Sequence, residues 1–224
     1  MNPLRAYFDA NRGPLLNKWL HYFDIYDHHF ARFRGRDVVM LEIGVYHGGS
    51  LALWKSYFGS RARLVGVDIN PRARQFADDQ VTIVIGDQSN RDFLRSLLLQ
   101  WPRIDILLDD GGHSMEQQIT TFEELYGAVA PNGVYMVEDT HTSYWPEYGG
   151  GLEGGNSFLE YTKRLTDQLN AWHVREWKDQ PRTEFSRSAW SISWYDSIVA
   201  IEKRPKVAPE ARMTGRPSFL ALDE

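Results

Sequence analysis

Residues 38–50 read VVMLEIGVYHGGS, an apolar run that leads into a glycine-rich turn. The run has the length and composition of a buried strand, and a helix is predicted over 51–58 directly after the turn. The same order repeats along the chain. Strands are predicted over 63–69, 81–88, 104–110 and 133–139, with helices over 91–100 and 114–129 and a turn at 131–133. This alternation predicts an α/β fold, in which a parallel sheet carries helices on both faces.

The two ends of the chain depart from this alternation. Apolar and aromatic residues recur every three to four positions over 14–34, which predicts an amphipathic helix in front of the sheet. A glycine-rich segment at 145–156 predicts a mobile loop, and a helix over 157–173 follows it. Strands over 185–195 and 197–202 meet at Asp196 as a hairpin. We therefore expect an N-terminal helical extension (1–36), one domain (37–204) and a proline-containing tail (205–224).

The composition narrows the classes of function. Of the 224 residues, 42% are hydrophobic and 13% aromatic, enough for a sizeable core, and the formal net charge is −5. A chain without a basic bias is not expected to bind nucleic acid or an anionic membrane. There is no cysteine, which excludes disulfides, thiolate zinc sites and cysteine nucleophiles and is typical of a reducing compartment. The first residues lack a signal-peptide pattern and no apolar run could span a bilayer, so we expect a soluble, cytoplasmic protein.

Three strand ends carry polar groups where an open α/β sheet binds its ligand. Glu42 stands two residues before Gly44, in a pattern that is not the G-x-G-x-x-G of dinucleotide-binding proteins. A carboxylate there suits a sulfonium cation carrying an amino acid better than it suits a pyrophosphate. Asp68 after the second strand suits ribose hydroxyls, and Asp87 and Gln88 after the third suit an adenine edge. Each feature alone is more often a turn or a helix cap, but their order favours an adenosyl pocket.

The next two strand ends are acidic. Asp109 and Asp110 close one strand, and Glu138 and Asp139 close the other. Carboxylates held close together repel unless a proton or a cation lies between them, and an all-oxygen group suits Mg²⁺ or Mn²⁺ better than zinc. His113 follows three residues after Asp110, and an imidazole can accept a proton near neutral pH. The alternative is that the first pair caps a helix and the second is solvated; two such pairs on one sheet favour a metal ion.

Five blocks of the sequence together resemble the class I S-adenosylmethionine-dependent methyltransferases. They are LEIGVYHGGS (41–50), GVDI (66–69), GDQS (86–89), DDGGH (109–113) and EDTHTSYW (138–145). The last two are similar more narrowly to the metal-dependent macrolide-sugar and polysaccharide sugar O-methyltransferases, a group that also resembles the proteins called cephalosporin hydroxylases. The resemblance covers about residues 41–148 and, more loosely, the C-terminal hairpin. It implies a Rossmann-like, seven-stranded, mostly parallel sheet whose last strand is antiparallel, with an extra N-terminal helix.

The resemblance also implies roles for individual residues. S-adenosylmethionine would be bound by Glu42, Gly44, Tyr46, His47, Gly48, Ser50, Asp68, Asp87, Gln88 and Asp109. A Mg²⁺ or Mn²⁺ ion would be held by Asp110, Glu138 and Asp139, with His113 as general base and Asp110 beside it in catalysis. Asp109 is the ambiguous member, because it could instead face the surroundings of the metal or have no role.

The expected activity is methylation of a sugar hydroxyl, on a glycosylated natural product or on an oligosaccharide such as a methylated mannose polysaccharide, by a homodimer. Candidate acceptor residues are His141, Tyr144 and Trp145, with Tyr148 beside them, because aromatic faces pack on sugar rings. His21, Asp24 and His28 are secondary candidates. Three alternatives remain: a catechol-like acceptor, an NAD-binding oxidoreductase, which the missing G-x-G-x-x-G disfavours, and a cofactor-binding protein without turnover.

Overall fold

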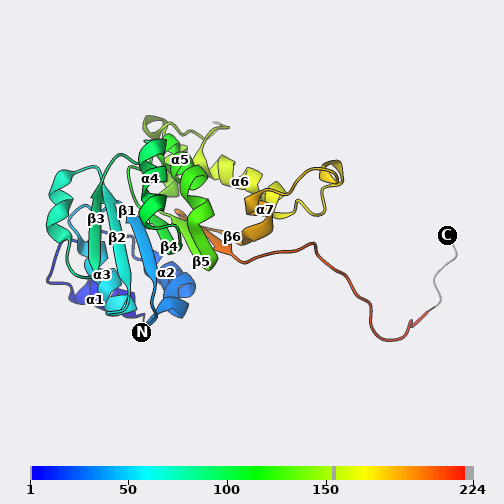
Figure 1. Ribbon diagram of the computed structural model, residues 1–224, viewed down its shortest axis with the longest axis horizontal. Coiled ribbons are helices and arrows are strands. Elements are labelled where there is room, and N and C mark those ends of the chain that lie inside the picture. Colours follow the sequence, from blue (N-terminus) through cyan, green and yellow to red (C-terminus); the bar gives the residue numbers. More distant parts are fainter. Residues whose placement is uncertain (1, 153–154, 220–224) are drawn as a thin grey trace.

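One seven-stranded sheet organises the molecule (Figure 1). The computed structural model describes residues 2–152 and 155–219. The strand order is β3-β2-β1-β4-β5-β7-β6. Only β7 runs antiparallel to its neighbours, which confirms the predicted mostly parallel sheet with an antiparallel last strand. The strands are β1 (Val39–Ile43), β2 (Arg63–Asp68), β3 (Val81–Ile85), β4 (Ile104–Asp109), β5 (Val129–Val137), β6 (Ala189–Tyr195) and β7 (Ile198–Lys203).

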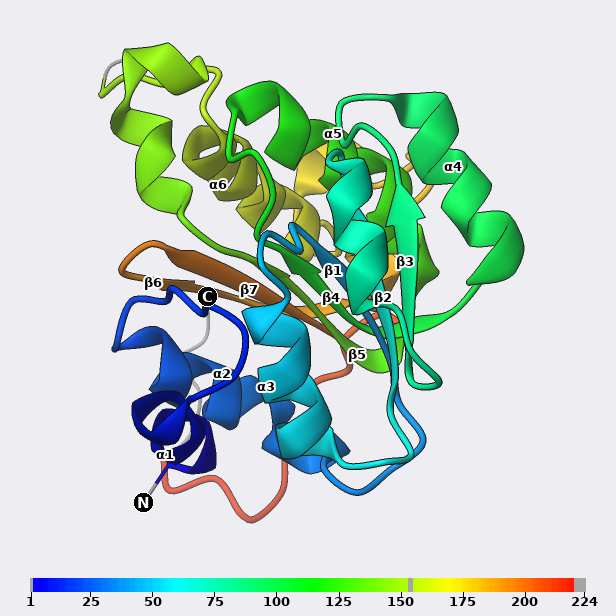
Figure 2. The same cartoon turned by 90° about the vertical axis from the view of Figure 1, so that its left-hand side faces the viewer.

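Helices cover both faces of the sheet, as Figure 2 shows. The first face carries α1 (Pro3–Ala10), α2 (Tyr22–Phe30) and α3 (Gly49–Phe58). The opposite face carries α4 (Arg91–Gln100), α5 (Met115–Leu125), α6 (Phe158–Leu169) and α7 (Glu184–Ser188). Short 3₁₀ helices complete the connections: η1 (Ala31–Phe33), η2 (Pro71–Phe76), η3 (Tyr126–Ala128), η4 (Thr140–Tyr144), η5 (Pro146–Tyr148) and η6 (Arg175–Trp177).

The alternation of side chains along the central strands decides to which face of the sheet the residues at each strand end point. Ile106 and Leu108 of β4 pack with the N-terminal helices, whereas Leu107 packs with α4 and α5. Continuing this period of two, Asp109 points to the α4–α5 face and Asp110 to the face of the N-terminal helices. The two acids of the first pair therefore serve opposite sides of the sheet.

The predicted helix over 14–34 is wrong in its first half. Residues 11–21 form no helix, and α2 begins only at Tyr22. Leu15 and Trp19 continue the helical spacing, but they are 56% and 58% exposed, so no core packing holds them in a helix. The unpredicted helix α1 begins instead at Pro3, where the Asn2 side chain caps the backbone amides of Leu4 and Arg5.

Smaller differences concern the later elements. The predicted turn at 131–133 lies inside β5, where Asn132 has a positive φ of 67° and the register against β4 shifts. The first residues of the predicted strand 185–195 belong to α7. The chain after β7 has no helix or strand up to residue 219 and extends away from the body in Figure 1. Parts of the predicted extension, loop and tail (residues 1, 153–154 and 220–224) lie outside the described residues. Among residues 2–152 and 155–219, no helix is long and apolar enough to cross a membrane.

Candidate active site

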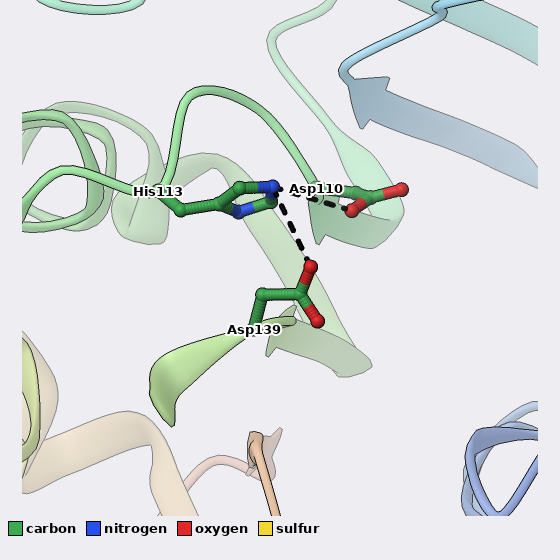
Figure 3. Close-up of side chains that lie close together, drawn as sticks. All are labelled: Asp110, His113 and Asp139. Carbon is green, nitrogen blue, oxygen red and sulfur yellow. Dashed lines mark ion pairs between the residues drawn. The ribbon is translucent and has the colours of Figure 1, made fainter. Parts of the chain in front are cut away.

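Asp110, His113 and Asp139 come together at the carboxyl edge of the sheet, from the loops after β4 and β5. His113 Nε2 lies 3.6 Å from Asp139 Oδ2 and 3.9 Å from Asp110 Oδ1. Figure 3 shows one ring nitrogen of His113 facing both carboxylates. One possible ligand atom from each residue lies within 4.8 Å of the others, and all three side chains are 20–25% exposed. The group is thus close enough to hold one cation and remains open to a ligand.

The backbone at this centre is held in an unusual conformation. His113 and Asp139 have positive φ angles of 58° and 51°, which residues with side chains adopt at a cost. The Thr142 hydroxyl secures both, because it donates to the carbonyl oxygens of His113 (2.8 Å) and Asp139 (3.0 Å). The surrounding structure therefore holds the backbone of these two residues in place.

A buried lysine sits beside the acids. The Lys18 ammonium donates to Asp110 Oδ2 and, at 2.7 Å, to Glu138 Oε2, and its side chain is 3% exposed. Burial lowers the pKa of Lys18, but the charges of Asp110, Glu138 and Glu42 raise it more, so the net pKa lies above its ordinary value. Lys18 remains charged, as a buried lysine paired with two carboxylates should.

Negative charge still exceeds positive charge here. Burial raises the pKa of Glu42 to about 7, although Ser50 (2.8 Å) and Trp54 (3.0 Å) both donate to its carboxylate. Burial, followed by the charge of Asp110, raises the pKa of Glu138 well above its ordinary value. Glu138 Oε1 is buried and has no hydrogen-bond partner in the described part of the chain. One lysine thus faces several crowded carboxylates, an arrangement that fits a further cation such as Mg²⁺.

A cavity of about 690 Å³ opens in front of β1, β2 and β4, and the acidic centre forms one end of it. Gly44, with a φ of +93°, brings the loop after β1 against the loop after β4, because a Cβ at this position would lie 1.9 Å from the Asp110 carbonyl oxygen. Asp68 Oδ2 accepts from the amides of Val45 and Tyr46 (both 2.9 Å) and so holds the first turn. The volume is that of a site for a cofactor-sized ligand.

A second cavity of about 310 Å³ adjoins the first. Both have Asn17, Asp110 and Asp139 in their walls. Lys18, Trp19, Leu20, Tyr22 and Glu138 complete the smaller one. The acidic centre therefore stands where two ligands could meet.

Comparison with known proteins agrees with this geometry. Residues 41–140 match the family described as "Methyltransferase domain". The chain carries a methyltransferase domain. This finding confirms the predicted resemblance, and the match covers the four strand ends from Glu42 to Asp110 and the fifth at Glu138.

The relatives of the chain are O-methyltransferases by their names. The chain is 36% identical, over 84% of its length and 52% of the relative's, to 8-demethyl-8-alpha-L-rhamnosyl tetracenomycin-C 2'-O-methyltransferase of Streptomyces olivaceus. It is 34% identical to demethylmacrocin O-methyltransferase of Streptomyces fradiae, over 84% and 51%. The structure of the MycE methyltransferase from the mycinamycin biosynthetic pathway, in complex with Mg and SAH, superposes with a TM-score of 0.83 at 28% identity, covering 91% of this chain and 55% of that one. The chain spans about half the length of the relatives it matches.

Within the methyltransferase domain, the residues predicted to bind the cofactor divide into two groups. Gly44, Tyr46, His47, Asp68, Asp87 and Gln88 line the larger cavity. Glu42, Gly48, Ser50 and Asp109 are not in its wall. Glu42 and Ser50 are buried and bonded to each other, and the Phe76 ring packs against Gly48. The binding roles themselves remain predictions.

Asp109 lies behind the wall of the larger cavity. It is fully buried, and its Oδ1 accepts from Gln88 Nε2 (2.6 Å) and from the amide of Gly111 (3.3 Å). Gln88 Oε1 in turn accepts from the amide of Gly112 at 3.1 Å. Burial raises the pKa of Asp109 to about 7, while the hydrogen bond from Gln88 opposes the rise. Asp109 and Gln88 thus hold the loop that carries Asp110 and His113.

Of the three predicted metal ligands, the structure groups Asp110 and Asp139 with His113, while Glu138 turns to Lys18. Lys18 was not predicted as a site residue. The sequence carried one signal for it. Lys18 stands three residues after Leu15 and four before Tyr22, and so places a charge on a helix face expected to be apolar.

A row of rings leads away from the smaller cavity, which it meets at Trp19. Trp19 and His141 have ring centroids 6.1 Å apart, His141 and Trp145 are 4.8 Å apart, and Trp145 and Tyr148 are 5.7 Å apart. We call these four residues the aromatic row. Tyr144 is 52% exposed and lies outside the row, and His21, Asp24 and His28 are in the wall of neither cavity. Trp19 joins the predicted acceptor residues His141 and Trp145 from a segment expected to be helical.

Proposed function

We propose that this chain is an S-adenosylmethionine- and Mg²⁺-dependent O-methyltransferase that acts on a sugar hydroxyl of a glycosylated natural product or an oligosaccharide. The observation that carries the proposal is the position of the Asp110–His113–Asp139 centre at the junction of two cavities. Methyl transfer is a displacement in which the new O–C bond forms as the C–S bond breaks. It therefore requires two ligands aligned end to end across one point.

The larger cavity would hold the methyl donor. Its polar lining at the ends of β1, β2 and β3 suits an adenosyl group, with Asp68 and Asp87 near the ribose and the base. The bound SAH of the MycE structure supports this choice. In this proposal the sulfonium cation and the transferable methyl group would lie at the acidic end of the cavity.

Asp110 and Asp139, with Glu138 as the predicted third ligand, would hold the ion. A bound Mg²⁺ would stabilise the negative charge that develops on the acceptor oxygen. Mg is also named in the MycE complex. The remaining steps belong to the residues of this chain, which orient the acceptor and take up its proton.

His113 would accept the proton of the sugar hydroxyl at Nε2. The two carboxylates at 3.6 and 3.9 Å would stabilise the imidazolium that results. Thr142 and Asp109 hold the loop that carries His113, so this loop would be in position before the acceptor binds.

The smaller cavity and the aromatic row would receive the sugar. Ring faces pack on the apolar face of a sugar, and the row continues from the cavity to the exposed surface at Trp145. An acceptor whose sugar enters the cavity while the larger aglycone or chain stays outside fits this shape. The relatives from Streptomyces act on rhamnosyl tetracenomycin and demethylmacrocin by their names, which supports a sugar rather than a catechol.

The N-terminal extension (1–36) would work as part of the catalytic unit with the domain at 37–204, because Asn17 and Lys18 form walls of the site. We further propose a cytoplasmic homodimer with the tail (205–224) as an accessory. Light scattering of the purified chain tests the dimer, and a monomer at micromolar concentration would contradict it.

The decisive test is transfer of labelled methyl from S-adenosylmethionine to 8-demethyl-8-alpha-L-rhamnosyl tetracenomycin C and to demethylmacrocin, with simple catechols as competitors. We expect transfer to a sugar acceptor, its loss in EDTA and its return with Mg²⁺. Full activity in EDTA would overturn the metal requirement and leave the donor site standing. If catechols were methylated or inhibited the enzyme and no glycoside accepted methyl, the acceptor would be a catechol and not a sugar. If calorimetry showed binding of NAD and not of S-adenosylhomocysteine, the assignment of the methyl donor would be wrong.

A further inference from the structure

The contact of Lys18 with the acids joins distant parts of the chain. Lys18 lies 92 residues from Asp110 and 120 residues from Glu138 in sequence, yet its ammonium is bonded to both. It enters from the non-helical segment before α2, and its side chain is almost fully buried. The fold thus brings a permanent positive charge to the centre from outside the sheet.

The lysine uses the same carboxylates that a metal ion would need. Asp110 offers Oδ2 to Lys18, while its Oδ1 faces His113. Glu138 offers Oε2 to Lys18, and its Oε1 is without a partner among the described residues. Glu138, bonded to the ammonium, is not part of the group formed by Asp110, His113 and Asp139.

We propose that Lys18 is a tethered counter-cation of the acidic centre, which holds Asp110 and Glu138 together without a divalent ion and competes with the ion for them. The inference rests on the proposed metal site. Lys18 is a positioning residue in this scheme, since it acts through the two carboxylates and not on the acceptor.

If the proposal holds, removing the positive charge of Lys18 has two opposite effects: it lowers the stability of the protein and it strengthens ion binding. Removing the ammonium leaves buried carboxylates without a counter-charge, which destabilises the protein when no divalent ion is present. Removing it also takes away a positive charge that repels the incoming ion, which tightens ion binding. A lysine that only braces the fold would produce the first effect and would weaken ion binding by disordering the ligands.

The test compares Lys18→Met with Lys18→Arg, which keeps the charge, and with Lys203→Met. Lys203 is a matched control because it is also buried, 5% exposed, and paired at 2.8 Å with Glu184, but it lies at the end of β7 away from the acidic centre. Each protein is titrated with MgCl₂ and MnCl₂ by calorimetry at one pH, and thermal unfolding is followed in EDTA and in saturating Mg²⁺.

We expect Lys18→Met to bind the ions at least about tenfold more tightly than wild type. It should unfold at lower temperature in EDTA and regain most of that loss with Mg²⁺. Lys18→Arg should bind within about threefold of wild type, and Lys203→Met should lose stability in both media with unchanged ion affinity. Equal or weaker ion binding by folded Lys18→Met overturns the inference, as does failure of this variant to fold in saturating Mg²⁺. If wild type itself binds neither ion, the proposed metal site fails instead.

Discussion

The Tyr22 hydroxyl donates a 2.6 Å hydrogen bond to Asp139 Oδ1, and so ties the start of α2 to the loop after β5. The two residues are 117 positions apart in sequence. Asp139 turns its other oxygen, Oδ2, toward His113. Burial, and then the hydrogen bond to Asp139, raises the pKa of Tyr22, so the phenol stays a donor. An N-terminal helix thus orients a carboxylate of the acidic centre.

Replacing Tyr22 by Phe tests this tie. The variant should lose about 2 kcal/mol of unfolding free energy, typical of a hydrogen bond to a charged group, and methyl transfer should fall roughly tenfold because Asp139 is less ordered. Tyr57→Phe is the matched control, since the Tyr57 hydroxyl donates at the same 2.6 Å to Asp27, away from both cavities. Urea unfolding and initial rates measure the two quantities. Equal rates for the two variants would contradict a role for Tyr22 in the centre.

His113→Asn should abolish most of the activity while leaving the donor site intact. Asn tolerates the left-handed backbone that His113 adopts, so the loop should keep its shape. Loss of a general base lowers kcat by roughly 10² to 10⁴. Calorimetry should show S-adenosylhomocysteine binding within about threefold of wild type, and the exposed His173→Asn should behave as wild type. A His113→Asn enzyme with a tenth of the normal kcat or more would rule out the proton transfer.

Glu42 should make the stability depend on pH. Its folded pKa of about 7 is above the ordinary 4.5, chiefly because of burial, so the folded state binds this proton more tightly than the unfolded state does. The stabilisation is complete below pH 4.5 and is lost as the pH rises through 7, by roughly 3 kcal/mol in all. As the pH rises from 5 to 8, the free energy of unfolding of Glu42→Gln should therefore increase relative to that of wild type, as measured by urea unfolding in EDTA. The exposed Glu176→Gln is the control. Parallel curves for Glu42→Gln and wild type would disprove the shift.

Asp109 should matter as a hydrogen-bond acceptor rather than as a charge. Asp109→Ala leaves Gln88 Nε2 and the Gly111 amide without their acceptor, and should cost about 1–3 kcal/mol of unfolding free energy and weaken Mg²⁺ binding. Asp109→Asn keeps an oxygen at Oδ1 and should lose less than half as much. Thermal unfolding and ion titration check both variants. If Asn were as damaging as Ala, the charge and not the loop contact would be the reason.

Trp19→Ala should raise the KM for the sugar acceptor roughly tenfold, because the aromatic row loses the ring nearest the smaller cavity. The affinity for S-adenosylhomocysteine should not change. Trp190→Ala provides the comparison, since Trp190 is similarly exposed, at 50%, but lies on β6. An unchanged acceptor KM in the Trp19 variant would remove this segment from the acceptor site.

Much of the fold was predictable because its signals are local. Each strand of the parallel part is an apolar run with a turn or an acid after it, and α4 begins and ends at the predicted residues 91 and 100. The polar groups that follow these strands had to share one edge of the sheet, since parallel strands end on the same side. The residues Asp68, Asp87, Asp110 and His113 could therefore be placed around one cavity from the sequence alone.

The partners of these residues could not be read from the sequence. Whether an acid after a strand points to one face or the other depends on the register of the sheet, and this separates Asp109 from Asp110. The spacing of Leu15 and Trp19 is that of a helix, but residues 11–21 form no helix, and Lys18 reaches the acids from this segment. Sequence by itself determined the strands, their polar ends and the kind of chemistry there. Tertiary structure alone decided which charges meet, because the contacts of Lys18 and Tyr22 form between segments about a hundred residues apart, where no local pattern records the pairing.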